Sequence, residues 1–268
     1  MTYPEVAGLD VRLDGGVLRV TIDAPSRRNA LDDSTLGAFV RAVETAQTDE
    51  RVRALLITGA GDHFCSGFDI IGRNAGGGQR PRVGAIQRRL PAQAHRLIPL
   101  LGRLQVPVVS RARGFAVGIG MQLLLVSDFV VAADTATLWE PFGCRGMTPD
   151  GGASWLLTRA VGPLRARQLL LLGRKLSGAE AADWGIVHEC VEDAELDGAA
   201  ERLVAELAAG PTVALGLTKW LINSGLERGL EEHLAQEAFA MELGSRSPDF
   251  QEGLAAFAQK RDPRFSGR

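Results

Sequence analysis

The sequence predicts an α/β fold, with a mainly parallel sheet covered by helices and a helical C-terminal part. Two observations lead to this prediction. Between residues 54 and 133, short apolar runs typical of buried strands alternate with segments of helical periodicity, as in strand–crossover–strand units. After Pro149 almost every segment has helical periodicity. The chain has 268 residues, of which 46% are hydrophobic, so it can bury a large core.

The chain begins with two runs of alternating apolar and polar residues, 9–13 and 17–22, separated by Asp14-Gly15-Gly16. This pattern is typical of a β-hairpin. A helix is expected from about residue 31 to Asp49, because its apolar residues recur at helical spacing and an acid lies in its first turn. The apolar run 54–58 then predicts a buried strand.

The middle of the chain is expected to add a long helix and two more strands. Residues 84–104 predict a helix that kinks at Pro91 and Pro99. The runs 106–112 and 128–133 predict buried strands, with an apolar helix between them.

The helices expected after Pro149 are 151–161, 163–172, 178–183, about 194–209, 211–225, 229–244 and 248–260, with one strand-like run at 186–191. The change from alternating α/β to helix suggests a core over 1–195 and a helical C-terminal part over 196–268. We expect the helical part to make subunit contacts.

Composition and charge argue against several functions. The formal net charge of −2 does not suit a nucleic-acid surface. Residues 1–5 lack the basic region and apolar core of a signal peptide, and no uninterrupted apolar run is long enough to span a bilayer. The three cysteines, Cys65, Cys144 and Cys190, are widely spaced, which favours reduced thiols over disulfides or a metal site. We therefore expect a cytoplasmic protein, with Cys65 as a buried, inert thiol.

The stretch 64–70, Phe-Cys-Ser-Gly-Phe-Asp-Ile, lies between a predicted strand and a helix start. The first N–H groups of a helix lack intrahelical acceptors, so they can bind developing negative charge. A second glycine junction, Gly118-Ile119-Gly120, opens another helix. Together the junctions suit an oxyanion hole, in which one donor contributes about 3 kcal/mol of transition-state stabilisation. Either junction alone is more typical of an ordinary glycine turn.

Several further motifs occur in the order typical of one family. The motifs lie at 28–31, 64–70, 113–120, 127–128, 149–152, 181–187 and 257–261. They resemble those of the crotonase (enoyl-CoA hydratase/isomerase) superfamily, and the resemblance covers about the whole chain. It implies a crotonase-like ββα spiral core, an acyl-CoA thioester substrate, and a homotrimer or dimer of trimers.

The resemblance also implies roles for individual residues. The backbone N–H groups of Phe68 and Ile119 would be the two oxyanion donors. The residues expected along coenzyme A are Arg28, Ala30, Ser66, Asp69 and Ile70, with Phe257 and Lys260 contributed by a neighbouring subunit. Lys260 also suits a solvated C-terminal charge. No metal, flavin or nicotinamide site is evident in the sequence, so we expect no cofactor besides the coenzyme A of the substrate.

The chain departs from the hydratase pattern at both positions where a typical hydratase carries a glutamate. These positions are Gln122 and Phe142. An amide accepts no proton at neutral pH and a phenyl ring has no acid–base chemistry, so the usual two-carboxylate hydration is not expected. Ile119 replaces a glycine of the family, and its bulk would narrow the pocket.

Asp150 is the carboxylate that stands out instead. The run that begins Pro149-Asp150-Gly151-Gly152 resembles the isomerases of aromatic-ring catabolism and related enoyl-CoA isomerases. Removing a proton α or γ to a thioester gives a dienolate, whose oxygen needs the two N–H donors. An apolar setting would raise the pKa of the carboxyl toward working pH, which suits a base. Asp150 also suits an N-cap of the following helix.

Other candidate residues have weaker support. Glu140 is the second candidate carboxylate, although a surface or salt-bridged glutamate is the commoner arrangement. His63 and His95 lack partner spacing and are expected to be structural or exposed. The loop 72–83 suits a lid or a surface insertion, and the segment 72–100 is expected to line the acyl pocket.

Three functions compete. The favoured one is an enoyl-CoA isomerase that moves a C=C bond between the β,γ and α,β positions, with Asp150 as acid and base. The second is an enoyl-CoA hydratase, a lyase, in which Asp150 and Glu140 activate water. The third is a catalytically silent acyl-CoA-binding homologue. Nucleophilic attack by Asp150, as in dehalogenation, would need a dedicated aryl pocket.

Overall fold

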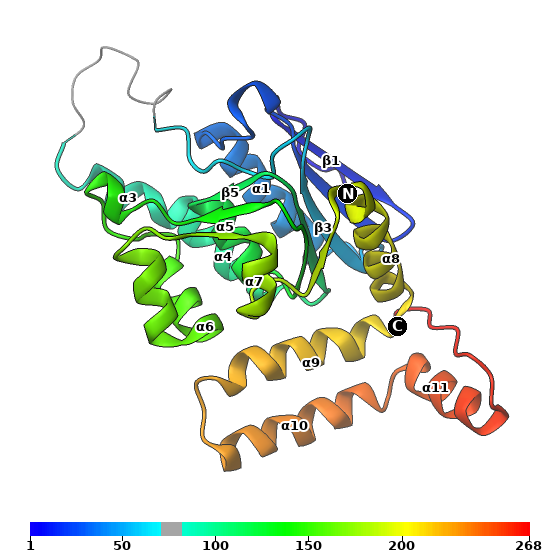
Figure 1. Ribbon diagram of the computed structural model, residues 1–268. Coiled ribbons are helices and arrows are strands. Elements are labelled where there is room, and N and C mark those ends of the chain that lie inside the picture. The colour runs from blue at the N-terminus through cyan, green and yellow to red at the C-terminus, as the bar shows by residue number, and fades with distance from the viewer. Residues whose placement is uncertain (71–81) are drawn as a thin grey trace.

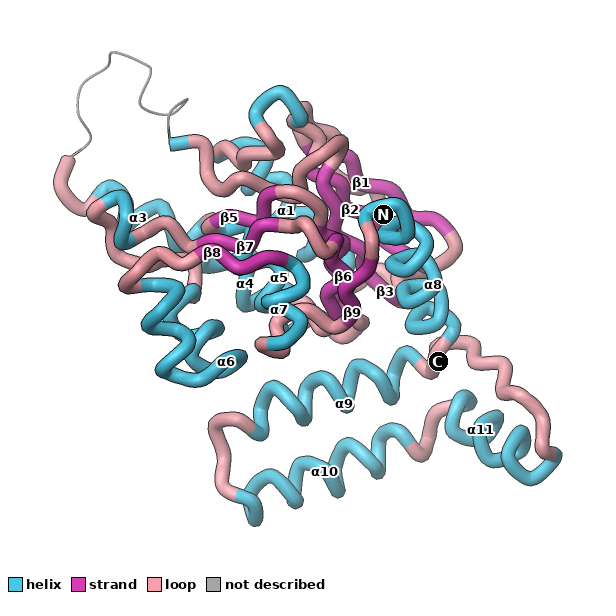
Figure 2. Tube along the Cα trace, in the orientation of Figure 1, coloured by secondary structure: helices cyan, strands magenta, loops and turns pink. Residues whose placement is uncertain are grey.

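A six-stranded sheet forms the centre of the computed structural model, which describes residues 1–70 and 82–268 (Figure 2). Its strands are β1 (Leu9–Asp14), β2 (Val17–Ile22), β3 (Ala54–Gly59), β4 (Val108–Ala112), β6 (Phe129–Ala133) and β9 (Glu189–Val191), in the order β1-β2-β3-β4-β6-β9. All neighbouring strands are parallel except the β1–β2 hairpin. The predicted hairpin and mainly parallel sheet are therefore confirmed, whereas most of the loop 72–83 lies outside the described residues.

A second, small sheet was not predicted. It consists of β5 (Phe115–Val117), β7 (Thr137–Trp139) and β8 (Lys175–Ser177), in the order β5-β7-β8. Each strand has three residues, which is too short to give a periodic pattern in the sequence. This sheet matters for function because β5 and β7 both lead into the candidate site.

Helices cover both faces of the large sheet (Figure 1). One face is covered by α1 (Asp33–Ala46), α4 (Ala94–Arg103) and α5 (Ile119–Val126). The other face is covered by α8 (Leu196–Ala209), whose Val204 and Ala208 pack on side chains of β2, β3 and β4. The side chain of Asp32 caps α1 and forms a capping box with Thr35, which explains why the helix begins there.

Proline and glycine interrupt two of the predicted helices. The expected helix 84–104 is divided by a 3-10 turn at Leu90–Ala92 into α3 (Ala85–Arg89) and α4, with Pro99 inside α4. The two helices expected at 151–161 and 163–172 form one element, α6 (Ala153–Leu170), interrupted at Gly162. The short helix α7 (Gly178–Asp183) follows β8 as expected.

The C-terminal helices are α9 (Thr212–Gly225), α10 (Leu230–Gly244) and α11 (Pro248–Gln259). In Figure 1, α9 and α10 form a hairpin that extends away from the large sheet. Lys219 of α9 fixes the hairpin to the core, because its Nζ lies 2.7 Å from Asp128 Oδ2 and donates to the carbonyl of Leu101 at 3.0 Å. Many apolar side chains of these helices are exposed, among them Trp220, Ile222, Leu230, Leu234, Phe239, Met241 and Leu254. No helix in the described part of the chain is long and apolar enough to cross a membrane.

Candidate active site

Backbone hydrogen bonds tie the first glycine junction to the second. The N–H of Cys65 donates to the carbonyl of Phe115 at 2.8 Å, and the N–H of Val117 donates to the carbonyl of Cys65 at 2.9 Å. A Cβ atom on Gly120 would lie only 2.4 Å from the carbonyl oxygen of Cys65. Only glycine permits this close approach, which brings the two junctions side by side.

Both expected oxyanion donors lie at these junctions. Ile119 is the first residue of α5, so its N–H has no acceptor within the helix. Gly118, with φ of 55°, turns the chain from β5 into this helix. Phe68 pairs with Leu31 in a parallel bridge directly after Gly67, whose φ is 108°. The structure therefore brings Phe68 and Ile119 into one region, as an oxyanion hole requires.

The residues expected along coenzyme A also lie together, with the exception of Phe257 and Lys260. The N–H of Ser66 donates to the carbonyl of Arg28 at 3.0 Å, and the N–H of Asp69 donates to the carbonyl of Leu31 at 2.8 Å. These bonds align the segment 28–31, which includes Ala30, with the segment 66–70, which includes Ile70. The guanidinium of Arg28 lies 5.5 Å from the centre of the Phe115 ring.

Asn29 holds this segment in place, and the sequence analysis did not single it out. Its side chain is fully buried, and its Nδ2 donates to the carbonyls of Ala60 at 2.8 Å and His63 at 2.5 Å. Its Oδ1 accepts from the N–H of Ala24 at 2.9 Å. Both Arg28 and Asn29 have positive φ, a conformation that asparagine adopts more readily than most residues. The presence of an asparagine within the 28–31 motif was the sequence feature that could have indicated this structural role.

Phe257 and Lys260 lie elsewhere in the molecule. Figure 1 shows α11 on the far side of the molecule from α3 and β5. The side chain of Phe257 is 87% exposed, and Lys260 is the C-cap of α11. Within one chain, these two residues do not join the site.

Asp150 lies in the loop that leads into α6, and it does not cap that helix. The N-cap of α6 is Gly152, with no side-chain cap. The alternative role of Asp150 as an N-cap is therefore wrong. Although the residue is exposed, partial burial of its carboxyl raises the pKa of Asp150, and the electrostatic effect of the nearby His95 ring opposes this.

His95 is the neighbour of Asp150 that the sequence analysis did not place in the site. Its Nε2 accepts a hydrogen bond from the N–H of Gly151 at 3.3 Å, which assigns the ring proton of the neutral form to Nδ1. The residue is exposed, as expected. His63 has a structural role, because its ring stacks on Phe115 at 4.8 Å and its Nδ1 accepts from the Phe115 N–H.

Glu140 is not on the surface, and it forms no salt bridge with another residue in the described part of the chain, so the commoner arrangement expected for it is wrong. It follows β7 directly and is fully buried, as is Gln122 on α5. Burial raises the pKa of Glu140 well above its usual value, and the charge of Asp150 raises it further. A smaller opposing effect comes from Gln122. Phe142, at the other position of a usual hydratase glutamate, is also buried.

The cysteines have no part in this site. All three are free thiols, and burial raises the pKa of Cys65 to about 12, so it is not a nucleophile at neutral pH. Among the described residues, no group of three or more His, Cys, Asp or Glu side chains could hold a metal ion.

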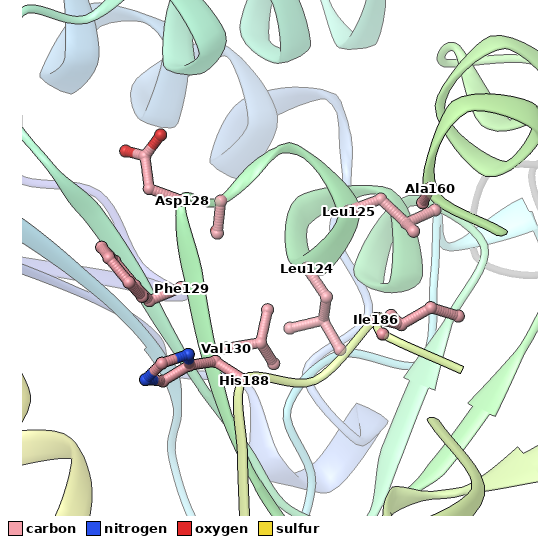
Figure 3. Close-up of a pocket in the computed structure, with 10 residues that line it drawn as sticks. Leu124, Leu125, Asp128, Phe129, Val130, Ala160, Ile186 and His188 are labelled. Atoms are coloured by element: carbon pink, nitrogen blue, oxygen red, sulfur yellow. The ribbon is translucent and has the colours of Figure 1, made fainter. Parts of the chain in front are cut away.

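A separate small cavity lies near the other end of α5 (Figure 3). Leu124, Val130 and Ile186 line it, and His188 packs edge-on against Phe129 at its rim. The carboxyl of Asp128 points away from these side chains, and it pairs with Lys219. Neither Phe68 nor Ile119, the two expected oxyanion donors, is among the residues that line this cavity.

Comparison with known proteins agrees with this geometry. The profile of the family described as enoyl-CoA hydratase/isomerase matches residues 12–268. The chain is 37% identical to 1,2-epoxyphenylacetyl-CoA isomerase of Escherichia coli (strain K12), over 96% of this chain and 97% of the relative. It is 35% identical to a protein of Rhodobacter capsulatus named as a probable enoyl-CoA hydratase, over 94% and 95%.

A solved structure of an enoyl-CoA hydratase from Polaromonas sp. JS666 has the same fold. It superposes with a TM-score of 0.89 at 30% identity, covering 96% of this chain and 99% of that one. The predicted crotonase fold is thereby confirmed over nearly the whole chain. The chain belongs to the enoyl-CoA hydratase/isomerase family of the crotonase superfamily and is an enzyme that acts on CoA thioesters.

Proposed function

We propose that this enzyme is an enoyl-CoA isomerase that moves a C=C bond between the β,γ and α,β positions, with Asp150 as acid and base. The observation that carries the proposal is the environment of the Asp150 carboxyl and its raised pKa. Its carboxyl lies beside His95, does not cap α6, and has a raised pKa because of partial burial. A base with a raised pKa can both take and return a proton near neutral pH.

The reaction needs one base and one site for negative charge. Asp150 takes a proton from the α carbon of a 3-enoyl thioester, and the electron pair of the broken C–H bond moves into the conjugated system. The resulting dienolate carries its charge on the thioester oxygen, which the N–H groups of Phe68 and Ile119 stabilise. Asp150 then returns the proton to the γ carbon, which gives the 2-enoyl thioester.

Hydration is the second candidate, and the positions of Gln122 and Phe142 speak against it. Neither side chain can activate a water molecule by accepting its proton. Glu140 is the other carboxyl of this region, and it is fully buried with a pKa raised well above its usual value. Burial disfavours the ionised form of Glu140, which is the form that hydration would need as its base.

The substrate's coenzyme A is proposed to lie along the paired segments 28–31 and 66–70, with Phe257 and Lys260 supplied by another copy of the chain. The exposed apolar side chains of α9 and α10 support an assembly of several copies, because large exposed apolar patches typically mark interfaces. A homotrimer or a dimer of trimers would bury these helices and bring α11 of one copy to the site of the next.

The experiment is product analysis with 3-enoyl-CoA and 2-enoyl-CoA substrates, for the wild-type enzyme and Asp150→Asn. Double-bond migration that falls by about 10²–10⁴-fold in the variant would support the proposal. The exposed Asp14, in the β-hairpin, gives a matched control: Asp14→Asn should leave the rate unchanged.

Two results would contradict the isomerase. Formation of a 3-hydroxyacyl-CoA as the main product would make the enzyme a hydratase. Binding of acyl-CoA without turnover, unchanged in Asp150→Asn, would indicate a silent homologue.

A further inference from the structure

Two buried polar side chains beside Asp150 have no part in the mechanism above. Glu140 and Gln122 are both 0% exposed. Neither oxygen of the Glu140 carboxyl and neither polar atom of the Gln122 amide has a hydrogen-bond partner among the described residues. An unpaired buried polar group destabilises the fold, and an unpaired buried charge destabilises it more. Four such atoms in one place require an explanation.

Glu140 follows β7 of the small sheet, and Gln122 lies on α5, which begins where β5 of the same sheet ends. Glu140 directly follows Trp139, whose carbonyl accepts from the N–H of Gly118 at 2.9 Å. Gly118 is the N-cap of α5, and its carbonyl accepts from the N–H of Gln122 at 3.0 Å. Gln122 is close enough for hydrogen bonding to lower the pKa of Glu140, although no hydrogen bond of ordinary geometry joins the two groups in the structure.

The surroundings of Glu140 favour its neutral form. Burial raises its pKa most, and Asp150, in the loop before α6, is the charged group that raises it further. His95 of α4 acts on Asp150 in turn. No salt bridge compensates a charge on Glu140 among the described residues. Burial and the charge of Asp150 together favour the protonated form of this carboxyl.

We propose that Glu140 is a neutral carboxylic acid paired with the amide of Gln122, and that this pair positions the backbone beside Asp150. The acid O–H donates to Oε1 of Gln122, and the amide Nε2 donates to the remaining acid oxygen. This reciprocal arrangement satisfies all four unpaired atoms at once. It requires a proton on Glu140, because a carboxylate has nothing to donate to the amide oxygen.

The Glu140–Gln122 pair affects Asp150 because the Gln122 amide packs against Gly151, the next residue in the chain. A Cβ atom on Gly151 would lie 1.9 Å from Oε1 of Gln122, so the amide is packed directly against this part of the backbone. Fixing the amide therefore fixes the peptide next to Asp150. This makes Glu140 a positioning residue for the reaction, and its catalytic meaning rests on the proposed function.

The neutral state of Glu140 also matters for the base. An ionised Glu140 would raise the pKa of Asp150 by repulsion, and it would keep Asp150 protonated and unable to take the substrate's proton. It would also oppose the negative charge that develops at the oxyanion hole. A neutral Glu140 leaves Asp150 free to ionise.

The first test is independent of activity. Infrared difference spectroscopy at neutral pH should show the C=O stretch of a protonated carboxyl in the wild-type protein and in Asp150→Asn. The band should disappear in Glu140→Gln and persist in the control Glu206→Gln, which changes an exposed carboxyl of α8. Absence of the band in the wild type, or its persistence in Glu140→Gln, would overturn the proposal. Glu140→Met is a second variant for the same band if Glu140→Gln does not fold.

The second test is the pH profile of kcat/KM. Glu140→Gln keeps a neutral side chain that can pair with Gln122, so its rate at neutral pH should stay within about threefold of the wild type. Gln122→Glu replaces the amide by a second carboxyl. The acid limb of the kcat/KM profile of this variant should move to a pH higher by about one unit, so that kcat/KM below the midpoint falls about tenfold. An unchanged profile in Gln122→Glu would contradict the positioning role. If the infrared band is assigned to Glu140 but the enzyme isomerises no substrate, the proposed function is wrong and the proposed Glu140–Gln122 pair is still supported.

Discussion

At the scale of single residues, the proposed mechanism depends on the protonation state of Asp150. Its pKa is raised from the ordinary value of 3.8, because burial disfavours the charged form more than His95 favours it. The base must be ionised to take a proton. We therefore expect kcat/KM for isomerisation to fall as pH decreases, with a midpoint above 3.8. A pH–rate profile measures this, and a midpoint at or below the ordinary value would contradict the expected environment.

A substitution at Gly151 tests whether the backbone beside Asp150 must keep its position against Gln122. Its φ is 57°, and an added Cβ would lie 1.9 Å from Gln122 Oε1, so Gly151→Ala must displace the amide or the backbone beside Asp150. Misplacing a catalytic group by about 1 Å can cost about 10²-fold in rate. We expect kcat to fall by about that factor, as measured by steady-state kinetics.

Gly146 provides the matched control for this variant. It has a similar φ of 66°, but an added Cβ would meet nothing within 4 Å. Gly146→Ala should therefore show only the backbone strain of about 1–2 kcal/mol in stability, with kcat close to wild type. Equal losses of kcat in both variants would mean that strain alone, and not the contact with Gln122, explains the effect.

The sequence analysis could name site residues that belong to short, continuous sequence motifs. The glycine junctions and Asp150 belong to such motifs. Glu140 follows a strand of three residues, so no periodicity indicated that it faces inward. His95 contacts Gly151 across 56 positions of the chain, a separation that no local pattern reveals.

At the scale of elements, the proposed oxyanion hole depends on how closely α5 approaches the segment before Phe68. Gly120 lies in the first turn of α5, where alanine would ordinarily favour the helix by about 1 kcal/mol. Here an added Cβ would lie 2.4 Å from the carbonyl oxygen of Cys65. Gly120→Ala should therefore separate the two junctions, and kcat should fall by about 10²–10³-fold, as for loss of one donor.

Gly198 in α8 is the control for this prediction. An added Cβ there would meet only the flexible end of Arg202 at 3.4 Å. Gly198→Ala should raise or preserve the midpoint of urea unfolding and leave kcat unchanged. If Gly120→Ala behaved in the same way, the close approach of the two junctions would not be needed for catalysis.

Element prediction from the sequence succeeded where the elements are long. The first five strands of the large sheet and the C-terminal helices have clear periodicity, and they lie close to the expected ranges. The three residues of β9 are the end of the strand-like run expected at 186–191. The small sheet of β5, β7 and β8 was missed, because each strand is held by its partners in the fold and not by its own pattern. The expected helix 84–104 was divided at Pro91, where the ring is incompatible with a continuous helix.

At the scale of the whole molecule, the proposed role of the C-terminal helices depends on other copies of the chain. Lys219 anchors α9 to Asp128, but the exposed apolar side chains of α9 and α10 are left uncovered in one chain. The helix α11, which contains Phe257 and ends at Lys260, lies on the far side of the same chain from α3 and β5 (Figure 1). A site completed by a neighbouring subunit explains both observations.

Subunit complementation tests this arrangement. Asp150→Asn removes the base of its own site, whereas Lys260→Ala would weaken the coenzyme A site of a neighbour and raise KM. Each homo-oligomer should be impaired. In mixed oligomers, a site on a Lys260→Ala subunit keeps its own Asp150 and gains Lys260 from an Asp150→Asn neighbour, so a fraction of sites should recover the wild-type KM.

The measurement is the rate at low substrate concentration after the two variants are unfolded together and refolded as a mixture. Separately refolded variants that are then combined without exchange are the control, because they contain the same chains without mixed sites. Since every restored site needs residues from two chains, a gain in rate over the control requires an active site shared between subunits. No gain, with mixed oligomers confirmed by mass spectrometry, would place Lys260 outside the coenzyme A site and leave it as a solvated charge at the end of α11.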